Sequence, residues 1–249
     1  MLTEQTIEIM RSLRLTGMIE AFEEQQRTVK VNDLSFDERL GLLVDAERTY
    51  RENRRLNRYQ KAAKFRHPQA CIEDLDYAPR RKLDKPVILQ LSSCRWIKEN
   101  QNVIITGATG VGKSYLACAL GIQACRKGYK VLYRRAPRLF NELALSHADG
   151  TFAKLLNQFA KTDLLIIDDF AMSPIKPADR RDLLEVIEDR DNTRSTIIAG
   201  QLPVDEWHEY LNEPTTADAI CDRLVHNAHK ISLKGPSKRK ELAKKMKKK

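Results

Sequence analysis

The sequence predicts an α/β fold, with a parallel sheet between two layers of helices and a small all-helical domain in front of it. From about residue 101 onward, short runs of Val, Ile and Leu without polar alternation recur between segments of helical periodicity. This pattern is typical of parallel strands that are buried on both faces. The first hundred residues carry helical patterns without such strand signals. We therefore expect them to lie outside the sheet.

Five strands are expected in the α/β domain, at residues 103–106, 130–134, 164–168, 196–199 and 230–233. Helices are expected between them, at residues 115–127, 137–146, 151–160, 178–190 and 215–226. Right-handed crossovers between such strands give an open three-layer sandwich. The ligand site of such a sandwich lies at the carboxyl ends of the strands.

The part of the chain before the sheet has two segments of helical pattern, at residues 2–27 and 36–65. Ser35 and Glu38 form a capping box that opens the second segment. Prolines interrupt the stretch that follows it, as is typical of an irregular connector. The predicted division is a helical domain at 1–66, a connector at 67–100, the α/β domain at 101–235 and a basic tail at 236–249.

The segment from Gly107 to Ser114 matches the phosphate-binding loop pattern G-x-x-x-x-G-K-[ST] at every fixed position, between a predicted strand and a predicted helix. In that setting the loop N–H groups and the positive end of the helix hold a phosphate chain. Lys113 is expected to reach the terminal phosphates, and Ser114 to ligate Mg²⁺. A chance match is the alternative, and it is rare in this strand–helix context. The residues predicted to bind the nucleotide are Gly107, Ala108, Thr109, Gly110, Val111, Gly112, Lys113, Ser114 and Tyr115.

Two further strand ends carry polar side chains that suit phosphate chemistry. Asp168 and Asp169 follow a run of four apolar residues, so Asp168 is expected to hold Mg²⁺ and Asp169 to deprotonate the attacking water. The alternative is a buried strand followed by an N-capping Asp. Gln201 ends the next strand and would point toward the terminal phosphate and the water, although many strands end in a polar residue.

Charge and cysteine content narrow the class of protein. The formal net charge of +10 favours a polyanionic partner. The five cysteines lack metal-ligand spacing, and their odd number argues against a closed set of disulfides. Neither a membrane-spanning apolar run nor the form of a signal peptide is present. We expect a reduced, cytoplasmic protein without a membrane partner.

A run of basic residues at the end of the second helical segment predicts contact with duplex DNA. Several of them share one helix face at i, i+3, i+4 and i+7 spacing, with Tyr50 and Tyr59 among them. Such a stripe binds a phosphate backbone without selecting bases. The alternative is a solvated helix face. The residues of the basic stripe are Arg48, Arg51, Arg54, Arg55, Arg58, Lys61 and Lys64, and the run continues to Arg66.

Four segments together resemble the AAA+ ATPases, in the branch that holds the helicase loader DnaC and the IstB-type helper ATPases of bacterial insertion sequences. They are 107–114, 164–169, 196–207 and the pair 221–224 and 235–239. The resemblance covers nearly the whole chain, including the segment 13–18. It implies a core with a five-stranded parallel sheet. The few residues after the last predicted strand leave no room for the helical lid domain of other AAA+ proteins.

The resemblance also implies roles for single residues. Gln201 falls at the first sensor position, where Asn is usual, and Arg239 at the second-sensor position, with a solvated tail residue as the alternative. Arg223 matches the arginine finger that reaches the γ-phosphate in a neighbouring subunit; the alternative is a surface arginine paired with Asp222. Asp169 stands where most AAA+ proteins have Glu, and this shorter carboxylate is expected to slow hydrolysis.

The function that the resemblance implies is that of an ATP- and Mg²⁺-dependent ATPase that assembles head to tail on duplex DNA and assists the transposase of its insertion element. It would act in the bacterial cytoplasm, at the nucleoid. A helicase loader of the DnaC kind is the alternative. Two other possibilities are a DNA-binding scaffold that holds ATP with negligible hydrolysis and, more distantly, a small-molecule kinase.

Overall fold

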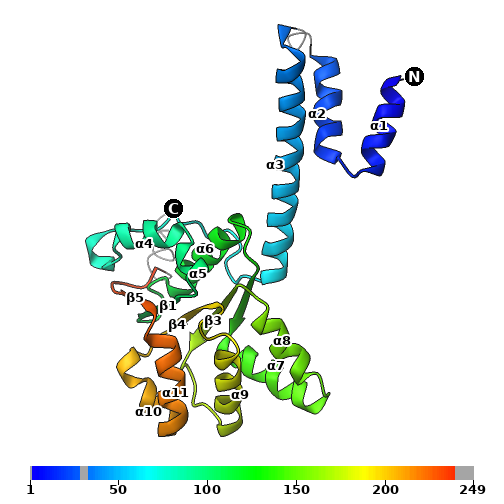
Figure 1. The fold of residues 1–249 in the computed structure, drawn as a ribbon. Helices are drawn as coiled ribbons and strands as arrows, with labels where there is room; N and C mark the ends of the chain where they lie inside the picture. The colour runs from blue at the N-terminus through cyan, green and yellow to red at the C-terminus, as the bar shows by residue number, and fades with distance from the viewer. Residues whose placement is uncertain (1, 29–32, 239–249) are drawn as a thin grey trace, which may run out of the picture. The chain divides into compact units, whose positions relative to one another are not determined.

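A computed structural model describes residues 2–28 and 33–238 of the chain (Figure 1). The chain divides into two compact units, Met1–Arg58 and Tyr59–Lys249. The described residues of the first unit form helices and no strand, and the second unit contains a five-stranded parallel sheet with its helices. The predicted fold class is thereby confirmed. In the described ranges, no helix has the length and apolar character that crossing a bilayer requires.

The first unit is built from α1 (Leu2–Ser12), α2 (Thr16–Arg27) and most of α3 (Phe36–Ala63). The expected helix over 2–27 is divided in two because Arg14 adopts a left-handed conformation, with φ of 59°. The capping box at the start of α3 is present: Ser35 N donates to Glu38 Oε2 at 2.8 Å, and Glu38 N donates to Ser35 Oγ at 3.3 Å. Lys64, with φ of 58°, follows the end of α3.

Gly17 brings α2 and α3 into close contact. A Cβ atom at Gly17 would lie 2.7 Å from both Ala46 O and Tyr50 Cβ, so only glycine fits this crossing. Beside it, the buried Glu47 accepts hydrogen bonds from Met18 N at 3.1 Å and from Arg51 Nε at 2.6 Å. Burial alone would raise the pKa of Glu47, but the hydrogen bonds that it accepts and the positive charge of Arg51 together lower the pKa below its usual value. Glu47 therefore stays ionised and ties the two helices together.

The sheet of the second unit has the strand order β2-β3-β4-β1-β5, and every pairing is parallel. The strands are β1 (Asn102–Gly107), β2 (Val131–Arg135), β3 (Leu164–Phe170), β4 (Ser195–Gly200) and β5 (Ala228–Leu233). They lie within one or two residues of the predicted strands. The runs of Val, Ile and Leu in β1 to β4 are almost wholly buried, whereas β5, at the edge of the sheet, alternates exposed and buried residues from Lys230 onward.

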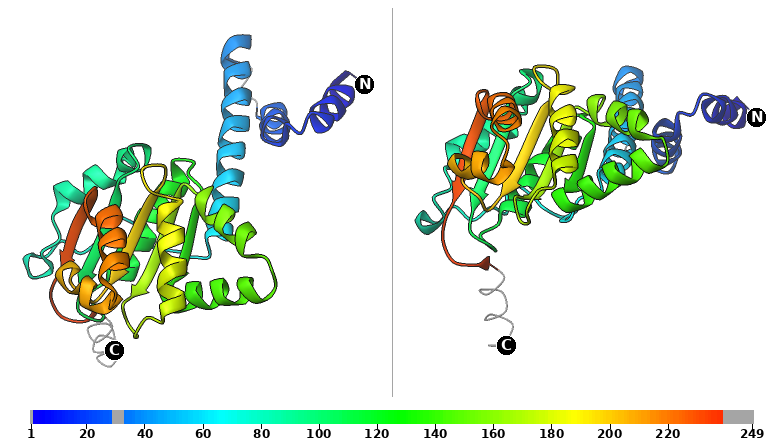
Figure 2. Two further views of the ribbon diagram at one scale, coloured as in Figure 1. Left: turned by 60° about the horizontal axis from the view of Figure 1, so that its bottom comes forward. Right: turned by 90° about the horizontal axis from the view of Figure 1, so that it is seen from below.

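Helices cover both faces of the sheet, as Figures 1 and 2 show. One face carries α6 (Lys113–Arg126), with α4 (Lys85–Ser92) packed against it and the short α5 (Arg95–Lys98) after α4. The helices on the other side of the sheet are α7 (Ala136–Ala148), α8 (Phe152–Ala160), α9 (Pro177–Glu188), α10 (Trp207–Leu211) and α11 (Pro214–Val225). The 3₁₀ turns η2 (Pro79–Arg81) and η3 (Val204–Glu206) lie in the connections.

The second unit begins at Tyr59, whereas the predicted domain boundary follows residue 66. The reason is packing: Ala63 and Phe65 are buried, and the Phe65 ring lies against Gly121 of α6, where a Cβ atom would come within 2.6 Å of it. The region expected as an irregular connector also contains α4 and α5. It is therefore part of the second unit and supports α6.

Candidate nucleotide-binding site

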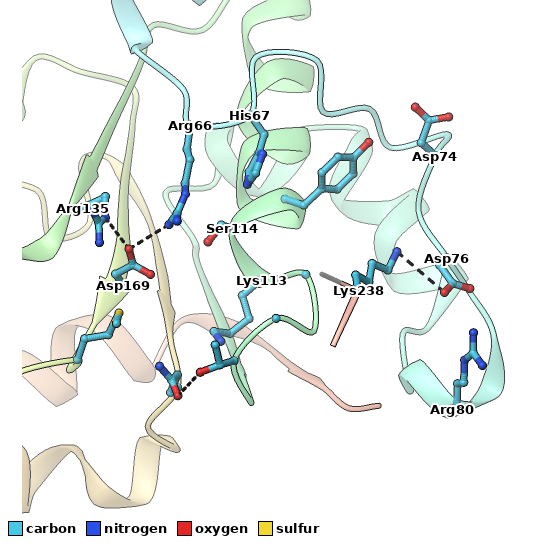
Figure 3. A pocket seen from close by; sticks show the side chains of 16 residues that line it. Arg66, His67, Asp74, Asp76, Arg80, Lys113, Ser114, Arg135, Asp169 and Lys238 are labelled. Carbon is cyan, nitrogen blue, oxygen red and sulfur yellow. Dashed lines mark hydrogen bonds and ion pairs between the residues drawn. The ribbon is translucent and has the colours of Figure 1, made fainter. Parts of the chain in front are cut away.

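Four adjacent strands end at one edge of the sheet, and each contributes a polar group or the phosphate loop to a single cavity. Gly107 ends β1, Arg135 ends β2, Asp169 lies at the end of β3, and Gln201 follows β4. The cavity has a volume of about 700 Å³ (Figure 3). It holds the side chains expected at the carboxyl ends of parallel strands.

The phosphate loop has the backbone that the motif requires. Gly110 and Gly112 have φ of 84° and 113°, in the region that other residues rarely adopt. Helix α6 begins at Lys113 without a side-chain N-cap, which leaves its first N–H groups available to an anion. Lys113 Nζ donates to Gly107 O at 2.8 Å and to Ala108 O at 3.0 Å. Its ammonium group is thus held over the loop, where a phosphate would lie.

Asp168 is 1% exposed and hydrogen-bonded on both oxygens. Tyr133 Oη donates to Oδ2 at 2.5 Å, and Asp169 N donates to Oδ1 at 2.9 Å. Burial, together with the charge of Asp168, raises the pKa of Tyr133, so the phenol remains a donor. Ser114 lines the cavity, whereas the buried Asp168 is not among the residues that line it. Carboxylate and hydroxyl oxygens are ligands that Mg²⁺ prefers, so the chemistry of this pair of side chains suits the ion.

Asp169 lies between two guanidinium groups, which approach it from two sides in Figure 3. Arg135 Nε is 2.6 Å and Arg66 Nη1 is 3.1 Å from Asp169 Oδ2. Asp169 has φ of 55°, a left-handed conformation that Asp adopts more readily than most residues. The strand bulges at this point, between Ile167 and Phe170. The bulge turns Asp169 toward the cavity.

Arg66 is a site residue that the sequence assigned to the basic run. The structure places it beyond the end of α3, with its side chain 32% exposed and 3.9 Å from Asp168 Oδ2. Burial alone would lower the pKa of Arg66, but the neighbouring carboxylates of Asp169 and Asp168, together with the Tyr133 hydroxyl, raise it more. Arg66 therefore lies in the nucleotide cavity as a firmly ionised group.

The wall beyond the phosphate loop comes from the segment after β5 and from residues 67–80. Lys238 N donates to Gly110 O at 2.9 Å, and the buried Arg81 donates to Pro236 O at 2.5 Å and to Asp76 Oδ2 at 3.2 Å. The side chains on this wall that sequence reasoning missed are His67, Asp74, Asp76, Arg80 and Lys238, with Met172 beside Asp169. Tyr115, which was expected to contact the nucleotide, also lines the cavity.

The family model of IstB-like ATP binding proteins matches residues 8–246 of the chain. The chain belongs to this family. Two relatives, in Sinorhizobium fredii and Pseudomonas fluorescens, have names that refer to an insertion sequence and to ATP binding. The first, y4pL, is 48% identical over 240 residues, which cover 96% of this chain and 98% of that protein. The second, of insertion sequence IS1162, is 49% identical over 203 residues, which cover 82% and 88%.

Solved structures share the fold of this family member. The DnaI structure superposes with a TM-score of 0.55 at 21% identity, covering 66% of this chain and 91% of that one. For the DnaC helicase loader the TM-score is 0.53 at 18% identity, with 66% and 97% covered. Membership of the IstB-like ATP-binding family makes the chain an ATPase of the IstB type, as the resemblance predicted.

Three residues that were expected near the phosphates, Gln201, Arg223 and Arg239, differ in where they lie. Thr109 Oγ1 donates to Gln201 Oε1 at 2.8 Å, so Gln201 contacts the phosphate loop. Arg223 does not line the cavity. It pairs with Glu188 at 2.9 Å, and not with Asp222. Arg239 lies outside the described residues.

The basic stripe lies on α3 except for Lys64, which follows the helix. Arg48 pairs with Asp45 at 2.6 Å, and Arg51 with the buried Glu47. Tyr50 packs against Gly17, so its proximity to the stripe reflects helix packing. Arg54, Arg55 and Arg58 are exposed. The stripe is therefore partly neutralised at its start and open to solvent farther along α3.

Proposed function

We propose that this IstB-like ATPase binds ATP between neighbouring copies of itself, assembles head to tail on duplex DNA, and assists the transposase of an insertion element. The position of Arg223 carries the proposal. Asn102 Nδ2, at the start of β1, donates to Arg223 O at 3.1 Å, whereas the phosphate loop follows the other end of β1. Arg223 thus lies at the amino end of the sheet, whereas the phosphate loop lies at the carboxyl end. The arginine would therefore reach the γ-phosphate bound by a second copy of the chain.

Within the site, the roles follow from position and chemistry. Lys113 and the loop N–H groups would bind the β- and γ-phosphates, and Ser114 and Asp168 would hold Mg²⁺. The ion would neutralise charge on the phosphate oxygens. Asp169 would orient the attacking water and accept its proton once its oxygen is released by the two arginines.

A head-to-tail contact is the geometry that places Arg223 of one copy at the γ-phosphate of the next. Such heterologous contacts give rings when the rotation closes and helices when it does not. Binding of ATP would strengthen the contact because the triphosphate supplies the charge that the finger meets. This makes assembly dependent on ATP.

Duplex DNA is the proposed template for assembly. The supports are the formal net charge of +10, the exposed arginines of the basic stripe and the insertion-sequence names of the relatives. The stripe would contact backbone phosphates, so binding should weaken steeply with salt and vary little with sequence.

The test is imaging of the protein on duplex DNA with and without a non-hydrolysable ATP analogue, beside a filter-binding titration. We expect regular assemblies only when both the analogue and DNA are present, and none for Lys113→Ala. Assembly that is independent of nucleotide would overturn the proposal. Pull-down with the element's transposase, compared with the host replicative helicase, separates the proposed role from that of a helicase loader.

One observation favours a second candidate, an ATP-holding scaffold with negligible hydrolysis. Asp169 is shorter than the usual Glu and is bound by two arginines. Phosphate release with and without DNA decides between the two: the scaffold predicts no DNA stimulation and an increase for Asp169→Glu. The left-handed backbone at this position costs Glu about 1 kcal/mol more than Asp, so nucleotide affinity should be measured in parallel.

A further inference from the structure

A second hollow of about 580 Å³ lies beside the nucleotide cavity and is lined mainly by cations. Its wall includes the end of β2, the first turn of α7 and the residues just after α3. Among the lining residues only Glu142 carries a carboxylate. The cations that line this basic hollow are Lys64, Arg66, Arg134, Arg135 and Arg138.

The positive end of α7 also opens into the basic hollow. The helix spans Ala136–Ala148 and begins after Arg135, whose side chain makes no capping hydrogen bond. Pro137 and Arg138, both in its first turn, line the hollow. The free N–H groups of an uncapped first turn favour an anion, and the neighbouring cations add to that preference.

Two of the five cations that line the hollow are not balanced by a carboxylate. Glu142 is engaged by Arg134, whose Nε lies 2.8 Å from Oε2. Among the described residues, Lys64 and Arg138 are exposed and form no ion pair. A group with two or more negative oxygens would satisfy these cations better than water does.

The lining favours a phosphate alone over a whole nucleotide. A base needs apolar or aromatic walls. The one aromatic side chain here, Tyr133, is buried and donates its hydroxyl to Asp168. A backbone phosphate of DNA matches the hollow, because only its charged oxygens need to enter.

The basic hollow shares two arginines with the nucleotide cavity. Arg66 and Arg135 line both spaces, and both bind Oδ2 of Asp169 (Figure 3). A phosphate in the hollow would compete with Asp169 for the two guanidinium groups. The carboxylate would then be free to act on water.

We propose that the basic hollow binds a phosphate of the DNA backbone and that this phosphate draws Arg66 and Arg135 from Asp169, which makes ATP hydrolysis respond to DNA. This rests on the proposed function, since it takes DNA to be the polyanion. It adds a DNA contact outside the basic stripe and a direct physical link from that contact to the catalytic carboxylate.

The test is Arg138→Ala in the full-length chain, because Arg138 lines the hollow and touches neither Asp169 nor the nucleotide cavity. Arg181→Ala is the matched control, an exposed arginine on α9 that lines neither space. DNA affinity is measured across a salt series, and hydrolysis with and without duplex DNA. Arg138→Lys tests whether charge alone restores the effect, and thermal unfolding shows that each variant is folded.

For Arg138→Ala we expect ~10-fold weaker DNA binding, as for loss of one charge-assisted hydrogen bond. The salt slope should fall by about 1. DNA stimulation should fall while the DNA-free rate stays equal to that of the unaltered protein. Arg181→Ala should match the unaltered protein in DNA affinity, salt slope and DNA stimulation.

If Arg138→Ala binds DNA and responds to it as the unaltered chain does, the hollow is not a DNA site. If the unaltered chain itself neither binds DNA nor responds to it, the proposed function fails as well.

Discussion

Arg66 Nη1 lies 3.1 Å from Oδ2 of Asp169, although the two residues are 103 positions apart in the sequence. Arg66 follows the last residue of α3 by three positions, and α3 carries most of the basic stripe. Asp169 is the proposed base. The chain segment that follows the basic stripe therefore enters the nucleotide cavity. It links the proposed DNA contact directly to the proposed catalytic carboxylate.

Replacement of Arg66 by Gln should raise the DNA-free rate of hydrolysis and reduce its stimulation by DNA. The reason is that one of the two cations that hold Asp169 is removed. An ion pair of this partly exposed kind is worth ~0.5–1 kcal/mol, which corresponds to a change of about 2- to 5-fold in rate. Steady-state phosphate release with and without duplex DNA measures both quantities.

Arg135→Gln is the companion variant, since Arg135 binds the same carboxylate oxygen. Like the Arg66 variant, it should raise the DNA-free rate of hydrolysis and reduce the stimulation by DNA. A fall in the DNA-free rate of both variants, with DNA stimulation intact, would show that the arginines assist hydrolysis directly and do not restrain Asp169.

The site residues that the sequence predicted are those whose chemistry follows from local context. Lys113, Ser114, Asp168 and Gln201 each lie at the end of an apolar strand or at the start of the following helix, and parallel strands bring such ends to one edge. Arg135 fits the same rule because it ends β2, next to β3. Its position directly after a predicted strand could have identified Arg135 as a site residue.

The positions of Arg66 and of the cavity wall beyond the phosphate loop could not be predicted from the ends of strands. The helical pattern was expected to reach residue 65, two residues past the end of α3, and Arg66 was assigned to the basic run that follows the helix face. The helix stops because Lys64 turns left-handed and Phe65 enters the core against Gly121. That contact joins segments more than fifty residues apart, and periodicity carries no information about it. Arg81 is a similar case, because it is buried against the segment after β5 and that contact joins residues far apart in the sequence.

Gly17→Ala should destabilise the N-terminal unit by about 1–3 kcal/mol, because the new methyl group would lie 2.7 Å from Ala46 O and force α2 away from α3. Hydrogen exchange of α2 in the full chain measures the effect. DNA affinity should fall with it, while DNA-free hydrolysis stays unchanged.

Gly41→Ala is the matched control for Gly17. It lies in α3 with no atom within 4 Å of the added Cβ, so it should stabilise the helix by about 0.5–1 kcal/mol. Equal protection from exchange in the two variants would contradict the close contact at Gly17.

Two cysteines should resist alkylation in the folded protein. Burial raises the pKa of Cys118 to about 11 and that of Cys125 to about 12. At pH 8 the thiolate fraction of Cys118 is then on the order of 10⁻³, and the thiolate is the reactive form. Mass spectrometry after iodoacetamide treatment should find both unmodified until denaturant is added, with the half-buried Cys71 and Cys221 as internal references. Modification of Cys118 before Cys71 would show that α6 is less well packed than the structure indicates.

Arg223→Ala should lower ATP hydrolysis by about 10³-fold if Arg223 completes the site of a neighbouring copy. In its own chain Arg223 pairs with Glu188, so a merely structural role would be disturbed as much by Glu188→Gln. That control should leave hydrolysis nearly unchanged.

Mixing Arg223→Ala with Lys113→Ala supplies the decisive measurement, because each variant is expected to be inactive alone. Of the four possible head-to-tail pairings in the mixture, only the one that joins the intact loop of Arg223→Ala to the intact arginine of Lys113→Ala can both bind ATP and receive the finger. Activity should therefore return in the mixture. A mixture that stays inactive while the two variants co-assemble would show that Arg223 acts within its own subunit.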